Sequence, residues 1–367
     1  MQQAIGASQI FTGETWLDDH VIIVSNGMIE DIIRKENLQA GIPLLFYNDN
    51  LLVPPFIDLQ VYGAAGRLLA VYPDVSTLEI MLSEFQSAGT SLFLPTVATN
   101  TIEVFRQCID AVGLYWQQGG RGIPGLHLEG PWLNEEKRGA HVKEWIHAPS
   151  ISEVKELLEY GKGVIRMITL APENCTGEII NLIKSHNIIL SAGHSNATYE
   201  QAIESFDSGI SAVTHLYNAM SPMQHRSPGL VGAAFNHHSV MASIIPDGYH
   251  VDFAAIVIAK KIMGERLFAI TDAVTGTSTG PYQHQLSADK YECNEVLSGS
   301  ALTMHKAFLN LVEKAGIEKS EALRMCSLYP AKLLGMDGQY GKIVPQASGQ
   351  FLLLTKQLGM AELIILQ

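Results

Sequence analysis

From about residue 54 to residue 335, short apolar runs alternate with longer helix-like segments. Several of these runs carry Ile, Leu and Val on both alternating faces, which is typical of parallel strands buried by helices. Strands are predicted at residues 56–62, 92–96, 124–129, 164–170, 188–194, 212–215, 240–246 and 267–272. Helices are predicted between them at residues 77–88, 102–117, 152–160, 176–186, 198–207 and 252–264.

Eight strands in this rhythm favour a TIM-type (β/α)8 barrel, an α/β fold, with a doubly wound open sheet as the alternative. The two ends of the chain differ from the middle, because residues 1–52 and 349–367 have strand-like pieces and no long helix. Such ends predict a small β-sandwich domain built from both termini. We therefore expect a β domain of residues 1–53 plus 340–367 and a barrel of residues 54–339.

The ends of the predicted strands are the places to look for chemistry, because the active sites of these barrels lie at the C-terminal ends of the strands. Side chains that titrate or bind metals occur there on five different strands. These residues are Glu129, His194, His215, the pair Asp247 and His250, and Asp272. Because all of them occur at or just after the end of a predicted strand, we expect them to share one site.

Two imidazoles and one carboxylate, from His194, His215 and Glu129, suit a catalytic zinc that keeps one position open for water. Such a metal lowers the pKa of water and polarises a carbonyl oxygen. Asp272 is then the expected general base, which takes a proton from water and passes it to the leaving amine. His250 is expected to stabilise the carbonyl oxygen as it becomes an oxyanion.

Two further residues have weaker support. Arg226 follows the sixth predicted strand, and its planar guanidinium suits a phosphate, although a role in stabilising its own loop is equally open. His141 follows the charged stretch at residues 135–138 and is either a substrate contact or a solvated loop histidine.

The formal net charge of −13 disfavours nucleic acid and anionic membranes as partners, because both need a basic surface. No segment has the roughly 18 uncharged apolar residues that a membrane span needs. The chain also shows no basic segment followed by an apolar one at its start. We therefore expect a cytoplasmic protein. Its four cysteines have no metal or redox spacing.

Longer stretches around these residues resemble the N-acetylglucosamine-6-phosphate deacetylases of the amidohydrolase superfamily. The resemblance extends from Pro54 nearly to the C-terminus, with the matching stretches in the same order. These stretches are LHLEGPWLNEEKRGAH (126–141), SAGHSNATYEQA (191–202), VTHLYNAMSPMQHRSPGLVGAA (213–234), IPDGYHVD (245–252), ITDAV (270–274), LSGSALTM (297–304) and YPAKLLG (329–335).

The resemblance implies hydrolysis of N-acetylglucosamine 6-phosphate to glucosamine 6-phosphate and acetate, in a homodimeric enzyme with an amino-sugar phosphate as substrate. It implies Glu129, His194 and His215 as ligands of one divalent metal, with Asp272 as the catalytic acid and base. It also implies a set of substrate contacts: His141, Asn218, Ala219, Arg226, Asp247, His250, Leu302, Thr303 and Met304.

Three positions depart from the pattern of the superfamily. Where many members have His-x-His at the end of the first strand, this chain has Gln60 and Tyr62, which are poor zinc ligands. One metal is therefore expected, most simply Zn²⁺, although Fe²⁺, Mn²⁺ and Co²⁺ suit the same ligands. Related enzymes with Gln at the first position often have Asn at the second. Pro55 replaces a usual Gly, which suggests an altered turn.

Three alternatives remain open at this point. N-acetylgalactosamine 6-phosphate or a related acylated amino-sugar phosphate is a substrate alternative within the same chemistry. A dihydroorotase-like enzyme is disfavoured, because such enzymes use the first-strand His pair and often a lysine on the fourth strand, and residues 164–170 contain no lysine. A non-catalytic sugar-phosphate sensor is disfavoured by the presence of Asp272.

Overall fold

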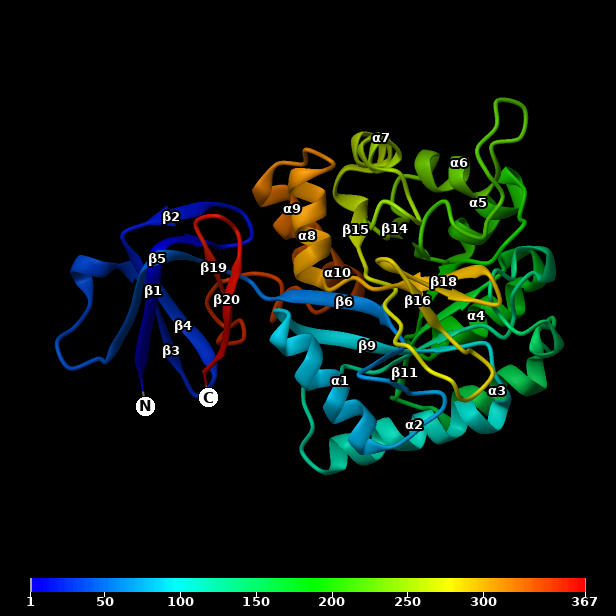
Figure 1. Ribbon diagram of the computed structural model, residues 1–367, viewed down its shortest axis with the longest axis horizontal. Coiled ribbons are helices and arrows are strands. Elements are labelled where there is room, and N and C mark those ends of the chain that lie inside the picture. The colour runs from blue at the N-terminus through cyan, green and yellow to red at the C-terminus, as the bar shows by residue number, and fades with distance from the viewer. Residues whose placement is uncertain (1, 367) are drawn as a thin grey trace. The chain divides into compact units, whose positions relative to one another are not determined.

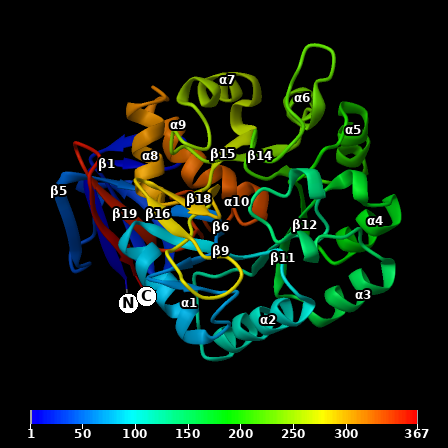
Figure 2. The same cartoon turned by 45° about the vertical axis from the view of Figure 1, so that its right-hand side comes forward.

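The computed structural model describes residues 2–366. Eight strands follow one another in chain order around one sheet, which confirms the predicted TIM-type barrel. Helices α2 to α7 lie outside these strands (Figure 2). The strands are β6 (Phe56–Val61), β9 (Thr90–Ala98), β10 (Leu126–Glu129), β11 (Ile165–Leu170), β12 (Ile189–Ala192), β13 (Ala212–Val213), β14 (Met241–Ile244) and β15 (Leu267–Ala269).

All six predicted helices are present. They are α1 (Val75–Ser87), α2 (Ile102–Gln117), α3 (Ile151–Tyr160), α4 (Gly177–Ser185), α5 (Tyr199–Ser208) and α7 (Phe253–Met263). Local sequence sets their ends. In α5, the side chains of Thr198 and Gln201 form a reciprocal capping box, and Gly209 ends the helix in the left-handed conformation.

The barrel closes between its first and last strands without a continuous ladder among the described residues, since β6 and β15 are the two ends of the sheet order. Val61 and Ala273 form an isolated parallel bridge there, and the Tyr62 N–H donates to the Ala273 carbonyl at 2.9 Å. We call this junction between β6 and β15 the seam. Within it, the buried Asp58 carboxylate accepts from the backbone N–H and the hydroxyl of Thr271. Side-chain and single backbone bonds therefore replace a strand ladder.

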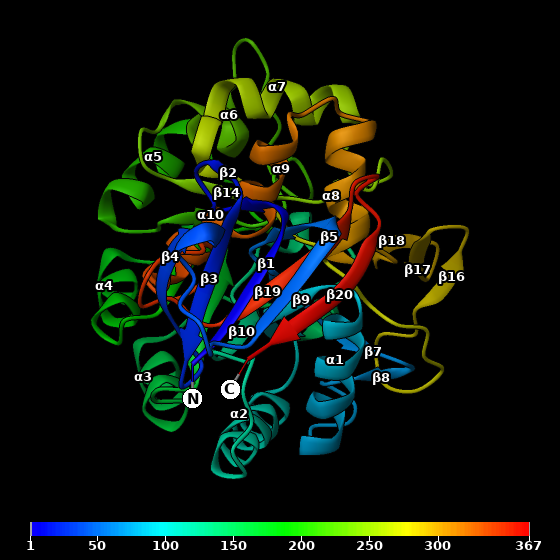
Figure 3. The same ribbon diagram turned by 90° about the vertical axis from the view of Figure 1, so that its left-hand side faces the viewer.

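Several elements were not predicted. Between α5 and α7 the chain forms α6 (Gly229–Asn236), and after β6 it forms the short hairpin β7 (Gly63–Ala64) and β8 (Arg67–Leu68). After β15 comes a three-stranded antiparallel sheet of β16 (Gln285–Ser287), β17 (Lys290–Cys293) and β18 (Val296–Ser300), yellow in Figure 3. Three helices follow, α8 (Met304–Glu313), α9 (Lys319–Cys326) and α10 (Leu328–Leu334).

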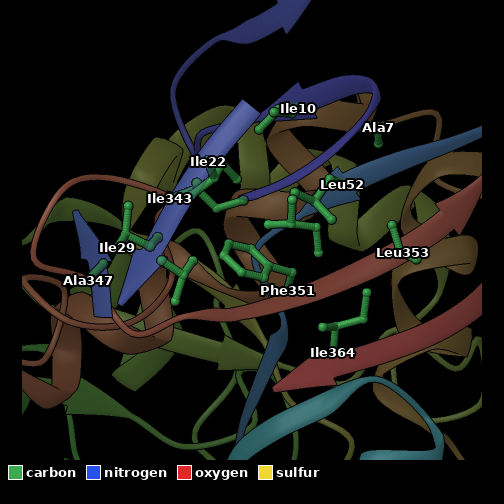
Figure 4. Close-up of a cluster of buried hydrophobic side chains, with 12 residues drawn as sticks. Ala7, Ile10, Ile22, Ile29, Leu52, Ile343, Ala347, Phe351, Leu353 and Ile364 are labelled. Carbon is green, nitrogen blue, oxygen red and sulfur yellow. The ribbon is translucent and has the colours of Figure 1, made fainter. Parts of the chain in front are cut away.

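Strands from both termini share one seven-stranded sheet, as Figure 3 shows, in the order β20-β19-β5-β1-β3-β4 with β2 against β1. The strands are β1 (Gln3–Phe11), β2 (Trp16–Asp18), β3 (His20–Ser25), β4 (Met28–Arg34), β5 (Leu44–Val53), β19 (Gln350–Thr355) and β20 (Met360–Ile365). Alternation along β1 places Ile5 in the cluster around Phe351 (Figure 4) and Ala4 in a second cluster with Val21. The predicted β domain of both termini is thus present, with apolar clusters on both faces of its sheet.

Contacts divide the chain into two compact units. One comprises the stretches up to Ile57, Phe85–Ser91 and from Met304 onward, and the other comprises Asp58–Glu84 and Leu92–Thr303. These limits differ from the boundaries at residues 53/54 and 339/340, which remain our proposal. All residues that line the large cavity described below belong to the second unit.

Candidate active site

Four predicted catalytic or metal-binding residues lie just at or past the C-terminal ends of barrel strands and face one cavity of about 310 Å³. Glu129 ends β10, His194 and His215 follow β12 and β13 by two residues each, and Asp272 follows β15 by three. All four are buried. The strand periodicity therefore brings together side chains that are up to 143 residues apart (272 − 129) in the sequence.

The ligand atoms converge on the Glu129 carboxylate. Its Oε1 atom is 3.1 Å from His215 Nε2 and 3.3 Å from His194 Nε2, and these two nitrogens are 3.1 Å apart. Its Oε2 atom is 3.2 Å from Nε2 of His141. Four potential metal ligands thus surround one point. Glu129 Oε1 and the Nε2 atoms of His194 and His215 lie within 3.3 Å of one another, whereas the ligand atoms of Glu129, His141 and His194 lie within 4.8 Å of one another.

Hydrogen bonds at the far ring nitrogens distinguish these imidazoles. His194 Nδ1 is 2.9 Å from the Lys137 carbonyl, which only accepts, so Nδ1 carries a proton and Nε2, which faces Glu129, is the nitrogen that could bind a metal. His141 Nδ1 lies 2.7 Å from Thr99 Oγ1 and accepts from the Thr99 N–H at 3.3 Å, while Nε2 faces the Glu129 carboxylate, which only accepts, so the neutral ring carries its proton on Nε2. Burial and the nearby His194 lower the pKa of His141 to about 4, which keeps that ring neutral. His141 is therefore a hydrogen-bond donor rather than a ligand.

His215 completes the carboxylate and imidazole set. Its Nδ1 atom is buried and has no hydrogen-bond partner among residues 2–366, while its Nε2 atom faces Glu129 and His194. Although burial opposes ionisation, hydrogen bonds from His141 and His194 and the positive potential of His194 hold the pKa of Glu129 well below its usual value. An ionised carboxylate beside two imidazole Nε2 atoms fits a divalent cation. We therefore favour His215 over His141 as the third ligand.

Asp272 lies against Tyr62 beside this cluster. The Tyr62 hydroxyl is 3.2 Å from Asp272 Oδ1 and 2.5 Å from Glu129 Oε2, and the Gln60 amide donates to both Tyr62 Oη (2.7 Å) and Glu129 Oε1 (3.0 Å). Burial raises the pKa of Asp272 above its usual value. The two residues that replace His-x-His thus act as hydrogen-bond donors around the carboxylates.

His250 also lines the cavity and is paired with Asp247. His250 Nδ1 is 2.6 Å from Asp247 Oδ2, and the other Asp247 oxygen accepts from the backbone N–H groups of Tyr249 and His250. Although burial opposes ionisation, these bonds lower the pKa of Asp247, so its carboxylate is charged. The charged Asp247 engages Nδ1 of His250, which leaves Nε2 as the ring nitrogen without this partner.

Several site residues have left-handed backbones, which non-glycine residues adopt only under tertiary constraint. The φ angles are 46° at His194, 36° at His215 and 55° at Asp272. Neighbouring groups hold these turns, since the His215 N–H donates to Ser243 Oγ at 2.8 Å and the Asp272 carbonyl accepts from the Ser300 N–H at 3.0 Å. The chain therefore accepts backbone strain where it orients these side chains.

Other predicted contacts are distributed unevenly. Asn218 and Ala219 line the cavity, as His141 does. Arg226 is exposed on a loop at residues 222–227 and does not line the cavity. Leu302 and Met304 are buried and Thr303 is exposed, and none of the three lines it. The substrate roles of these four residues stay predictions.

The structure also identifies cavity residues that the sequence pattern did not. Among the cavity-lining residues within 2–366, Lys137 is the only Lys or Arg. A second group comes from the segment after β15: Tyr282, His284, Leu297, Ser298 and Gly299. The stretch LSGSALTM contained part of this group, but nothing in its spacing indicated which residues face the cavity.

A closed parallel barrel with carboxylate and imidazole ligands at its strand ends and an acid after its last strand defines the class of metal-dependent hydrolases. Comparisons with known proteins agree. Residues 51–358 match the amidohydrolase family and residues 4–45 match the NagA composite domain. The chain therefore belongs to the amidohydrolase family.

Its relatives are deacetylases of acetylated hexosamine 6-phosphates. The N-acetylglucosamine-6-phosphate deacetylase of Haemophilus influenzae is 34% identical, covering 94% of this chain and 92% of the relative. The N-acetylgalactosamine-6-phosphate deacetylase of Escherichia coli is 31% identical, covering 94% and 93%. The crystal structure of the N-acetylglucosamine-6-phosphate deacetylase of Pasteurella multocida, 33% identical, superposes with a TM-score of 0.94 and covers 100% of this chain and 98% of that one.

Proposed function

We propose that this enzyme removes the acetyl group of N-acetyl-D-glucosamine 6-phosphate, giving D-glucosamine 6-phosphate and acetate, in amino-sugar catabolism. The observation that carries the proposal is the convergence of Glu129, His194 and His215 on one point, with Asp272 beside it in the same cavity. A mycobacterial deacetylase crystallised with N-acetyl-D-glucosamine-6-phosphate, 25% identical with a TM-score of 0.91, supports the choice of substrate.

We further propose that Glu129, His194 and His215 hold one divalent metal, most simply Zn²⁺, with Fe²⁺, Mn²⁺ and Co²⁺ as alternatives. Once bound, such a metal polarises the amide carbonyl and makes water a stronger nucleophile at neutral pH. Asp272 takes the proton from the attacking water and delivers it to the nitrogen as the C–N bond breaks. His250, held by Asp247, donates from Nε2 to the carbonyl oxygen as negative charge develops there.

The rest of the substrate is assigned to the remaining cavity residues. His141 is the proposed contact of a sugar hydroxyl, and Asn218 and Ala219, which also line the cavity, are the proposed contacts of the phosphate. Lys137 supplies the positive charge that an anionic substrate needs in a chain of formal net charge −13. Arg226 remains a proposed phosphate contact.

The alternative substrate is N-acetyl-D-galactosamine 6-phosphate. Curated relatives with this activity are 31% and 36% identical to the chain, as similar as the N-acetylglucosamine enzymes. The two sugars differ in the configuration of one hydroxyl, so the choice depends on a few hydrogen bonds in the cavity.

The test is acetate release by the purified protein with its bound metal quantified. N-acetylglucosamine 6-phosphate is compared with the galactosamine isomer and with unphosphorylated N-acetylglucosamine. We expect the highest kcat/KM for the first, at about one metal per chain. A higher kcat/KM for the galactosamine isomer would make that isomer the assigned substrate. Binding without acetate release would instead indicate a non-catalytic sensor.

Two wider expectations are also proposals. Residues 2–366 include no helix that is long and apolar enough to span a bilayer. A cytoplasmic location is proposed, because the relatives are deacetylases of sugar phosphates. A homodimer is proposed from the resemblance of the chain to its relatives, and the molar mass in solution, measured by light scattering, tests it.

A further inference from the structure

The Tyr62 hydroxyl lies where the two carboxylates of the candidate site meet. It is 2.5 Å from Glu129 Oε2 and 3.2 Å from Asp272 Oδ1, and it accepts from the Gln60 amide at 2.7 Å. Gln60 is buried, and Tyr62 is only partly exposed at the cavity surface. One phenol therefore joins a candidate metal ligand to the candidate proton carrier.

The backbone fixes this phenol relative to Asp272. The Tyr62 N–H donates to the carbonyl of Ala273, the residue that follows Asp272. On the other side of Asp272, Thr271 is tied to Asp58 through both its N–H and its hydroxyl. Tyr62 and Asp272 are thus both held by bonds across the same seam of the barrel.

The contacts also orient Glu129. Its Oε1 atom faces His194 and His215. Its Oε2 atom accepts from the Tyr62 hydroxyl at 2.5 Å, the shortest of its contacts, and lies 3.2 Å from His141 Nε2. A carboxylate free to rotate would exchange these oxygens. The phenol prevents this exchange, because its single proton is committed to Oε2 while Gln60 holds Oε1.

We propose that Tyr62 is a positioning residue whose one hydroxyl proton, donated to Glu129 Oε2, fixes Glu129 as a single-oxygen metal ligand, while its backbone N–H, bonded to Ala273, keeps the neighbouring Asp272 beside this carboxylate. The metal-binding part rests on the geometry of the cluster, and only the turnover part rests on the proposed deacetylase function. The replacement of His-x-His by Gln60 and Tyr62 then substitutes hydrogen-bond donors for a second cation between the two carboxylates.

The test variant is Tyr62→Phe, which keeps the ring and removes the hydroxyl. Zinc affinity is measured on metal-free protein by competition with a chelating indicator, and kcat and KM are measured on the zinc-loaded enzyme. We expect zinc affinity and kcat each to fall about tenfold or more, with KM within about twofold of the wild type, as is usual when an outer partner of a metal ligand is lost.

Tyr115→Phe is the matched control. Tyr115 is also buried, and its hydroxyl donates to the Arg121 carbonyl at 2.6 Å, away from the cavity. It loses a comparable hydrogen bond and should keep the wild-type zinc affinity and kcat. If Tyr62→Phe does not fold, Gln60→Leu removes the amide that holds both the phenol and Glu129, and the same two quantities should fall.

Wild-type zinc affinity in Tyr62→Phe would overturn the proposal, even with reduced turnover, because Glu129 would then not need the phenol. A rise in KM at unchanged kcat would also overturn it, since the hydroxyl would then bind substrate. The zinc titration needs no substrate, so a failure of the deacetylase assignment leaves that result intact and distinguishable.

Discussion

Two sets of cavity-lining residues differ in origin, because one lies at the ends of barrel strands and the other comes from residues 282–299, after β15. We call the first set the floor (Tyr62, Glu129, His194, His215 and Asp272) and the second the wall (Tyr282, His284, Leu297, Ser298 and Gly299). The floor residues contact one another through charged and polar atoms. The wall consists of two residues with rings, one leucine, one serine and one glycine.

The two sets also differ in support. Each floor residue is attached to a strand buried among other strands, such as β10 with all four residues buried. Three wall residues, Leu297, Ser298 and Gly299, belong to β18 of an antiparallel sheet whose first strand, β16, has three exposed residues. The other two, Tyr282 and His284, precede that strand and are buried. Reacting groups therefore come from the rigid part of the fold, while the more exposed segment shapes access to them.

The largest effect should follow removal of metal. Dialysis against a chelator is expected to reduce acetate release to background, because water activation and carbonyl polarisation are lost together. Zinc should restore it at about one equivalent per chain. In Glu129→Gln, which lacks the anionic ligand, the same addition should not restore activity. Full activity of the metal-free protein would mean that the reaction at the floor residues does not need a metal.

Substitution of the proton carrier comes next. Asp272→Asn should lower kcat by about 10³-fold, since an amide does not accept the proton. The metal content should stay near that of the wild type, because Asp272 is outside the proposed ligand set. Elemental analysis and acetate release on the same sample measure both. Substantial turnover in the variant would contradict the assignment of Asp272.

A pH effect on stability is expected from the wall residue His284. Burial lowers the pKa of His284 to about 4, whereas the unfolded chain takes up this proton near pH 6.5. Below pH 6.5 the unfolded state therefore binds more protons, and stability falls as the pH drops from 6.5 towards 4. This residue alone should remove about 2–3 kcal/mol by pH 4.5.

The measurement is urea unfolding of the wild type and His284→Gln at pH 7 and pH 4.5. Glutamine keeps a partner for Ser298 Oγ, which lies 2.9 Å from His284 Nδ1. The variant should lose less stability between the two pH values. Equal losses in both proteins would mean that His284 does not titrate as its burial implies.

The smallest effect is expected at the apolar part of the wall. Leu297→Ala should raise KM about threefold at nearly unchanged kcat, because a modest apolar contact contributes equally to the bound substrate and the transition state. Steady-state kinetics with the phosphorylated substrate measure both constants. A large fall in kcat would instead mean that Leu297 contributes to the catalytic step, and the proposed difference between wall and floor would be wrong.

The floor was largely predictable from the sequence, and the reason is physical. Strands buried on both faces read as continuous apolar runs, and barrel geometry then places the residue after each run at one end. Glu129, His194 and Asp272 were found in this way, and the structure brings them together. What the spacing did not show is the contact of Tyr62 with Asp272, because it crosses the seam between strands far apart in the sequence.

The missed elements lack the periodic patterns on which such predictions depend. Helix α6 is almost uniformly apolar and buried, so it shows no polar face. Strand β16 has three exposed residues and no alternation. Helix α10 contains Pro330 near its start, in a segment of seven residues. The wall residues lie in or next to segments of this kind. They could therefore be identified only from their position in the folded structure.

The seam has a consequence for heat resistance. Between β6 and β15 the barrel is joined by the bonds of Tyr62 with Ala273 and of Asp58 with Thr271, and Asp272 sits between these two joints. A joint with few backbone bonds is where transient opening is least costly. Each such opening would separate Asp272 from the groups that position it. Evolutionary selection for a more stable seam and selection for catalytic turnover therefore act on the same few residues.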